Sequence, residues 1–270
     1  MATYIHGHSP SVLKAHATRT AARDAAYLLP HICPTHSILD VGCGPGTISA
    51  DLAQLVPQGH LTCLDLSPTA LASAQQTFST RGISNASFIA GNVIAGLPFP
   101  DETFDIVHAH MVLIHLPDPI TALREMRRVL KKGGVLACKD MIVSTMVWYP
   151  ADPRLRLFEV GIAGTIAETG ADPQMGGRLK GAALEVEFEQ EEVEARASCW
   201  AFADREGVEF WGESCAERLE EGSELRGRIV KGGFGTAEEV DGFVEASRRW
   251  AGMEEAWFGC MNGEILARKS

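Results

Sequence analysis

The sequence predicts an α/β fold in which helices cover both faces of a doubly wound, mostly parallel sheet. Between residues 30 and 140, short apolar segments alternate with segments of helical periodicity, which is the pattern of successive βαβ units. The apolar segments are nearly continuous rather than alternating, as expected of strands that are buried on both faces. The 270 residues, 46% of them hydrophobic, suffice for one large domain with a continuous core.

The elements of this predicted core follow in order along the chain. Residues 11–29 have apolar positions at helical spacing and predict a first helix. Ser67 is a good N-cap and Pro68 fits the first helical position, which predicts a helix that ends near residue 80. Two further helices are expected at residues 47–55 and 118–130, and a turn at residues 131–134. The predicted strands are residues 37–42, 60–66, 86–90, 103–109 and 135–140.

Beyond residue 140 the periodicity is weaker. We expect a strand at residues 193–202 and a final strand region at 255–268 that is broken near Asn262-Gly263. Helices are expected at residues 152–168, 205–226 and 237–251. The composition marks no linker, so residues 1–270 are predicted to form a single domain, with a cofactor-binding core at about residues 30–141.

Charge and composition exclude several classes of protein. The net charge is -11 and no basic cluster is present, which disfavours nucleic acid and anionic membranes as partners. No apolar run approaches the roughly 18–20 residues that span a bilayer, and no signal-peptide layout is seen, so a cytoplasmic protein without a membrane span is expected. The 7 cysteines are scattered without a C-x-x-C motif, so no metal site is predicted. The sequence leaves a homodimer open.

A glycine-rich loop is the central functional signal. Gly42, Gly44 and Gly46 stand at alternate positions between a predicted strand and a predicted helix. Such a loop lets a ligand approach the backbone at the carboxyl edge of a parallel sheet. Asp65 ends the second predicted strand, where a carboxylate can accept both hydroxyls of an adenosine ribose. The alternative for Asp65 is a role in starting the helix at Ser67.

The loop also indicates which nucleotide binds. Its spacing is Gly-x-Gly-x-Gly, whereas dinucleotide-binding loops usually read Gly-x-Gly-x-x-Gly. Asp40 precedes the loop, where a carboxylate disfavours an anion but suits an ammonium or sulfonium group. S-adenosyl-L-methionine carries both of these cations and no phosphate, so the charge favours it over NAD or FAD.

Five sequence blocks resemble the class I S-adenosylmethionine-dependent methyltransferases, in particular the ubiquinone/menaquinone-biosynthesis-type branch. The resemblance implies a Rossmann-like seven-stranded sheet whose last strand is antiparallel, with residues 193–202 and 257–267 as the final two strands. It also implies that S-adenosyl-L-homocysteine is the product. The blocks are residues 38–46, 64–67, 91–93 with 97–99, 104–107 with 116–118, and 130–136.

The resemblance assigns cofactor contacts residue by residue. Asp40 is expected to face the amino end of the cofactor, Asp65 to hold the ribose, and Leu66 to pack on the adenine. Asn92 stands where the family often has Asp, and its amide can still pair with the adenine amino group. The full set of implied cofactor-binding residues is Asp40, Gly42, Cys43, Gly44, Asp65, Leu66, Gly91, Asn92, Val93 and His110.

Methyl transfer requires mainly alignment of the nucleophile with the methyl group and exclusion of water. A general base contributes only where the nucleophile must lose a proton, and histidine suits that role near neutral pH. The candidates are His110, His115 and His8, with Asp140 as a competing carboxylate and His108 as a core histidine. The sequence does not choose among them.

The remaining segments are predicted to cover the substrate. Residues 1–29 and 203–252 are the candidate lid elements. Large aromatic side chains concentrate after residue 140, which favours a small aromatic or lipophilic substrate, with a carbon, oxygen or nitrogen acceptor. The alternatives are an NAD-dependent oxidoreductase on the same fold and a non-catalytic cofactor-binding protein. The aromatic candidates for the pocket are Trp148, Tyr149, Trp200, Phe202, Trp211 and Phe234.

Overall fold

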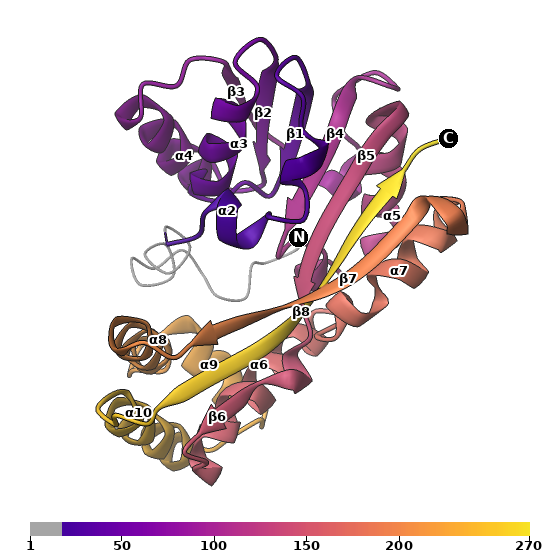
Figure 1. Cartoon of the computed structure of the whole chain (residues 1–270). Helices are drawn as coiled ribbons and strands as arrows, with labels where there is room; N and C mark the ends of the chain where they lie inside the picture. Colours follow the sequence, from indigo (N-terminus) through magenta and orange to yellow (C-terminus); the bar gives the residue numbers. More distant parts are fainter. Residues whose placement is uncertain (1–17) are drawn as a thin grey trace.

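The computed structural model describes residues 18–270, which form a sheet of eight strands flanked by helices (Figure 1). Five parallel strands run in the order β3-β2-β1-β4-β5, and β8 continues the sheet antiparallel to β5. This is the mixed, Rossmann-like sheet that the sequence predicts. The strands are β1 (Ser37–Val41), β2 (His60–Asp65), β3 (Ala86–Ala90), β4 (Phe104–His110), β5 (Leu130–Met141), β6 (Val147–Tyr149), β7 (Val193–Phe202) and β8 (Trp257–Arg268).

The antiparallel strand β8 organises the second half of the molecule. β7 pairs along one edge of β8 from Phe258 to Ala267, so β5 and the short β6 share the opposite edge. Figure 1 shows β7 and β8 extending past the parallel strands toward α6, α8, α9 and α10. The predicted final two strands are confirmed, and β6 is an addition that the sequence did not indicate.

Two hydrophobic clusters cover the two faces of the sheet. The cluster on one face joins α2 and α3 to Ile38 and Ile106. The other is larger and continues from α5 and α7 into α6, α8, α9 and α10. The helices are α2 (Ala21–Asp24), α3 (Thr47–Leu55), α4 (Pro68–Thr80), α5 (Pro119–Val129), α6 (Arg156–Glu168), α7 (Met175–Glu185), α8 (Arg205–Glu217), α9 (Glu224–Lys231) and α10 (Ala237–Ala251).

Local capping explains why several helices begin where the sequence predicts. The Ser67 hydroxyl accepts a hydrogen bond from the backbone of Ala70, and Pro68 is the first residue of α4. Asp118 caps α5 by accepting from the backbone N–H of Thr121 at 2.9 Å. The predicted bounds of α4 and α10 are confirmed.

One predicted turn and one predicted strand break are wrong. Residues 131–134 do not form a separate turn; they form a bulge within β5, where the pairing with β4 shifts and Gly133 has a φ of 76°. Strand β8 runs unbroken through Gly263. A Cβ on Gly263 would lie 1.9 Å from the carbonyl oxygen of Gly176 in α7, so this glycine permits close helix–sheet packing and does not end the strand.

Other differences lie in the helices. The single helix predicted at residues 205–226 is divided into α8 and α9, because Gly222 has a φ of 82° and Ser223 caps a new helix. Of the helix predicted at residues 11–29, only residues from 18 onward are described, and they contain the single turn α2. Helix α7 was not predicted. Within residues 18–270, no helix has the length and apolar character needed to cross a membrane.

Candidate functional site

The loop between β1 and α3 requires its three glycines for different reasons. All three have positive φ angles, between 54° and 74°. A Cβ on Gly42 would lie 2.5 Å from a methyl of Val112, and one on Gly46 would lie 2.8 Å from Ala74. A Cβ on Gly44 would meet nothing within 4 Å. Gly44 therefore presents its backbone to open space, whereas Gly42 and Gly46 allow close packing.

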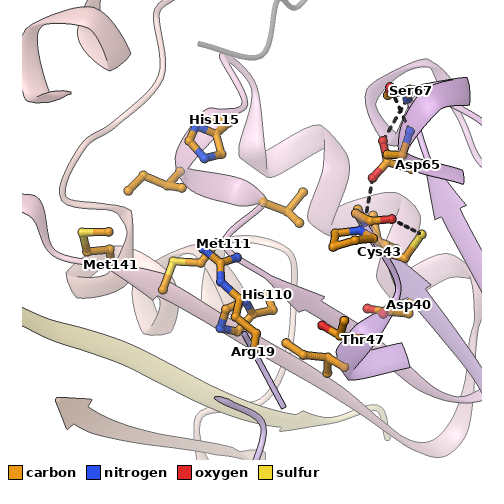
Figure 2. A pocket seen from close by; sticks show the side chains of 18 of the residues that line it. Arg19, Asp40, Cys43, Thr47, Asp65, Ser67, His110, Met111, His115 and Met141 are labelled. Atoms are coloured by element: carbon orange, nitrogen blue, oxygen red, sulfur yellow. Dashed lines mark hydrogen bonds between the residues drawn. The ribbon is translucent and has the colours of Figure 1, made fainter. Parts of the chain in front are cut away.

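Asp65 ties this loop to the start of α4. One of its carboxylate oxygens accepts a hydrogen bond from the backbone N–H of Gly44 at 2.9 Å, and the other accepts from Ser67 at 2.8 Å (Figure 2). Each oxygen retains a lone pair, since a carboxylate offers about four acceptor positions. Asp65 thus contributes to the helix start that the sequence suggested as its alternative role, and it also lines the cavity described below.

Asp40 is buried and held from two sides. The Nδ1 atom of His108 lies 2.8 Å from one carboxylate oxygen, and the Ser49 hydroxyl donates to the other. His108 is fully buried in the core, as expected. These contacts fix the orientation of the Asp40 carboxylate at the end of β1.

A single cavity of about 550 Å³ brings the predicted cofactor residues together. All ten of them line it, and His115 lines it as well; His8 lies outside the described residues. In Figure 2, Asp65 and Ser67 lie at one end, Met141 and His115 lie toward the other, and Arg19 and His110 lie between them. The ten residues are Asp40, Gly42, Cys43, Gly44, Asp65, Leu66, Gly91, Asn92, Val93 and His110.

Two residues at the predicted adenine end differ in how they are held. The side-chain oxygen of Asn92 accepts a hydrogen bond from the backbone of Ile94 at 3.0 Å, and so caps the short helix η2 (Val93–Ala95). Leu66 is 52% exposed, although it is a large apolar side chain. Leu66 also lines the cavity, so its exposed side chain is open to a ligand.

The titratable candidates differ in their access to the cavity. Burial, reinforced by the charge of Arg19, lowers the pKa of His115 to about 4, so this imidazole is neutral at neutral pH. Burial raises the pKa of Asp140 to about 8. The backbone N–H groups of Val112, Leu113 and Ile114 oppose this shift, because hydrogen bonds to the carboxylate lower its pKa. Asp140 is fully buried, does not line the cavity, and accepts from the backbone of Ile114 at 3.3 Å. It therefore supports the loop that carries His115.

Three of the six predicted aromatic residues line the cavity: Trp200, Phe202 and Trp211. The other three do not. Trp148 packs against Trp250 with ring centroids 4.8 Å apart, Tyr149 is 59% exposed, and Phe234 packs against Gly164.

Sequence reasoning missed several residues of the cavity wall. The i, i+4, i+8 spacing in α6 marks an apolar helix face, but it does not say what that face contacts. Arg19 carries no sequence signal; its guanidinium lies 5.2 Å from the ring centroid of Trp200. The missed residues include Arg19, Phe158, Ile162, Ile166, Phe210 and Arg218. Across the described chain, no three His, Cys, Asp or Glu side chains are grouped so as to hold a metal ion.

Comparisons with known proteins identify the family. Residues 34–162 match the sequence profile of a methyltransferase domain. An uncharacterized methyltransferase of Schizosaccharomyces pombe is 33% identical over 98% of this chain and 96% of its own length. A "Probable methyltransferase" of Aspergillus luteorubrus is 33% identical over 98% of this chain and 97% of its own length. The chain belongs to the class I S-adenosylmethionine-dependent methyltransferases.

The relation to the quinone branch is partial. Demethylmenaquinone methyltransferase of Listeria monocytogenes is 42% identical, but over only 38% of this chain and 44% of its own length. The fold is shared more widely. The crystal structure of a candidate methyltransferase from Bacillus halodurans matches with a TM-score of 0.60 over 91% of this chain and 98% of that one, at 19% identity.

The family membership makes the chain a methyltransferase enzyme with S-adenosylmethionine as its cofactor. The alternatives of an NAD-dependent oxidoreductase and of a non-catalytic cofactor-binding protein are therefore wrong. The residues present fit this cofactor, because Gly44 leaves room beside its backbone, Asp40 stands just before the glycine loop, and Asp65 lies beside Gly44.

Proposed function

We propose that this enzyme transfers the methyl group of S-adenosylmethionine to a small aromatic or lipophilic molecule. The observation that carries the proposal is that the glycine loop and an apolar wall of Phe158, Phe202 and Trp211 face the same cavity. Its volume of about 550 Å³ must hold the cofactor and the substrate together, which favours a small acceptor over a macromolecule.

The cofactor is proposed to lie along the glycine loop with its adenosine toward Asp65. The lone pairs that Asp65 does not use for Gly44 and Ser67 would accept the ribose hydroxyls. The opposite end is proposed to lie near Asp40, whose negative charge suits an ammonium group. The guanidinium of Arg19, in the middle of the cavity in Figure 2, is a complementary charge for a carboxylate.

When bound, S-adenosylmethionine supplies an electrophilic methyl group on a sulfonium, so the protein mainly positions the acceptor and excludes water. The N-terminal residues 1–29 and residues 203–252 are proposed as the covering elements; their described part contributes Arg19, Arg23, Phe210 and Trp211 to the cavity wall.

Two histidines in the described part of the cavity are candidates for proton transfer. His110 lies within the cavity beside Trp200, with ring centroids 6.1 Å apart. His115 is uncharged at neutral pH and can accept a proton from an oxygen or nitrogen acceptor. A carbon acceptor that is already nucleophilic would need neither base. We propose His110 as the first candidate, because Figure 2 shows it in the middle of the cavity, between the predicted ribose end and Met141.

The test is calorimetric titration of the whole chain with S-adenosylmethionine, S-adenosylhomocysteine and NAD. Loss of two hydrogen bonds to a charged group, each about 1.5 kcal/mol, predicts that Asp65→Ala weakens binding of the two sulfur cofactors by about 100-fold. Asp241→Ala is the matched control, because Asp241 is exposed and pairs with Arg226 outside the cavity.

Thermal melts of both variants separate lost binding from lost folding. Unchanged affinity in the folded Asp65→Ala variant would refute the ribose contact. Binding of NAD in preference to S-adenosylhomocysteine would contradict the whole assignment of the cavity.

A further inference from the structure

The face of α8 that is turned toward the cavity carries an unusual set of polar groups. Trp211, Ser214 and Arg218 follow at spacings of three and four residues, so they share one face of the helix. Trp211 and Arg218 line the cavity. Ser214 lies between them along the helix and is buried. None of these three residues belongs to the proposed cofactor contacts around the glycine loop.

Each of these side chains has a buried polar atom that makes no hydrogen bond within the described structure. The atoms are the indole Nε1 of Trp211, the hydroxyl oxygen of Ser214 and the guanidinium Nε of Arg218. An indole and a guanidinium only donate hydrogen bonds, and a serine hydroxyl can also donate. Buried donors are normally paired, so three on one helix face indicate a missing acceptor.

Arg218 differs in this respect from the other arginines of the same helical region. Each of the others in α8, α9 and α10 forms an ion pair, whereas Arg218 forms none with any described residue. Its place at the C-cap of α8 favours a cation there through the helix dipole. The dipole does not explain why the guanidinium lines an apolar cavity. The paired arginines are Arg205, Arg226, Arg228, Arg248 and Arg249.

The cavity wall around Trp211 is aromatic and apolar. Phe202 stacks on Trp211 with a centroid separation of 4.9 Å and an interplanar angle of 7°. Phe158 packs edge-on against Trp211 at 6.1 Å, and Ile162 of the same helix also lines the cavity. A charge–charge contact is stronger in such low-dielectric surroundings than in water.

We propose that the methyl acceptor is an aromatic or lipophilic acid, whose carboxylate is bound by Arg218 and the indole N–H of Trp211, with support from Ser214. The proposal rests on the proposed function, since it names the substrate class of the same cavity. The apolar body of the acid would lie against Phe158 and Phe202, and the carboxylate would supply the missing acceptors on α8.

The test compares acids with their neutral amides, which differ mainly in charge. Binding of 1-naphthoate against 1-naphthamide, benzoate against benzamide, and cinnamate against cinnamamide is measured by calorimetry on the whole chain with saturating S-adenosylhomocysteine. We expect at least one acid to bind about 10-fold more tightly than its amide, because a hydrogen-bonded ion pair is lost in the amide.

Variants of α8 then locate the preference. Arg218→Met replaces the charged side chain by an unbranched apolar one and is expected to abolish the preference for the acid. Arg218→Lys keeps the positive charge and is expected to retain part of that preference. Trp211→Phe keeps an aromatic ring but removes the N–H, and is expected to weaken binding of the acid several-fold and binding of the amide by less, because a hydrogen bond to a charged acceptor is the stronger one. Arg228→Met is the control, because Arg228 pairs with Glu224 on α9 and does not line the cavity.

The outcomes separate this proposal from the proposed function. If no acid binds better than its amide, or if folded Arg218→Met keeps the preference, the carboxylate subsite is refuted while binding of S-adenosylhomocysteine still supports the proposed function. If S-adenosylhomocysteine fails to bind but the acid preference persists and depends on Arg218, the subsite stands and the proposed function fails.

Discussion

A buried ion pair between β5 and β8 makes the strongest prediction about stability. Lys139 of β5 and Glu264 of β8 are opposite each other in the sheet, with Nζ and Oε1 3.0 Å apart. The Ser198 hydroxyl donates to the same glutamate oxygen at 2.5 Å. Lys139 is 1% exposed and Glu264 is 7% exposed, so neither charge is well solvated. The charge of each side chain is therefore compensated mainly by the opposite charge of the other.

Lys139→Met removes one charge and keeps a side chain of similar length. The Glu264 carboxylate then remains buried with the Ser198 hydroxyl as its remaining side-chain partner, and we expect the free energy of unfolding to fall by about 3–5 kcal/mol. Replacing both members, Lys139→Met with Glu264→Leu, removes the uncompensated charge. The double variant is expected to lie within about 1 kcal/mol of the natural protein, or above it, because well-packed apolar residues often replace a buried pair without loss.

Equilibrium urea unfolding, followed by tryptophan fluorescence, measures these differences. Lys131→Met is the matched control, because Lys131 pairs with Asp105 at 2.9 Å but is 41% exposed, and exposed pairs contribute about 1 kcal/mol or less. A cost below about 1 kcal/mol for Lys139→Met would refute the reasoning that the pair is desolvated. A double variant as unstable as the single one would show that lost packing, rather than an unpaired charge, sets the cost.

Three further predictions concern the helices and the cavity. Gly176→Ala would bring a Cβ to 2.2 Å from the carbonyl oxygen of Asp140, so thermal melts should show that overpacking lowers the free energy of unfolding by about 2 kcal/mol. Gly177→Ala is the control: its Cβ would come no closer than 3.9 Å to any described atom outside its own helix backbone, so the free energy of unfolding should rise by about a few tenths of a kcal/mol through the gain in helix propensity. Because the folded pKa of His115 is about 4 against 6.5 in the unfolded chain, the unfolded state takes up the proton first as the pH falls. Stability should therefore drop between pH 6.5 and 4, by at most about 3 kcal/mol, and His115→Gln should lack this component in urea titrations at each pH. Asp118→Ala should cost about 1 kcal/mol through loss of the α5 cap, and no loss in the melting curve would refute that role.

The parallel half of the fold could be predicted because its determinants are local. Ser67-Pro68 starts α4 through one hydroxyl and one fixed φ angle, and Asp118-Pro119 starts α5 through one carboxylate and one fixed φ angle. The glycine loop needs positive φ angles that only its own sequence can supply. For this reason the first four predicted strands, β1 to β4, agree with the structure to within one residue at each end.

The errors have a common physical origin in tertiary contacts. Gly176-Gly177 is a poor helix signal, yet α7 forms because Gly176 packs directly on Gly263 of β8. The same contact explains why Gly263 lies within a continuous strand instead of breaking it. Lys139 follows a run of buried apolar residues in β5, and its pairing across the sheet with Glu264 explains its burial.

The cofactor side and the substrate side of the cavity differ in how they are encoded. The proposed cofactor side is formed by the segments that follow β1, β2, β3 and β4, so short sequence motifs indicate it. The proposed substrate side is assembled from Phe158 on α6, Phe202 on β7, Trp211 on α8 and Arg218 at its C-cap, residues up to 60 positions apart along the chain. Their convergence depends on β7 and β8 extending beyond the parallel strands, as Figure 1 shows. Changes in this wall can therefore alter the acceptor without disturbing the glycine loop, which accounts for a cofactor that sequence identifies and a substrate that it does not.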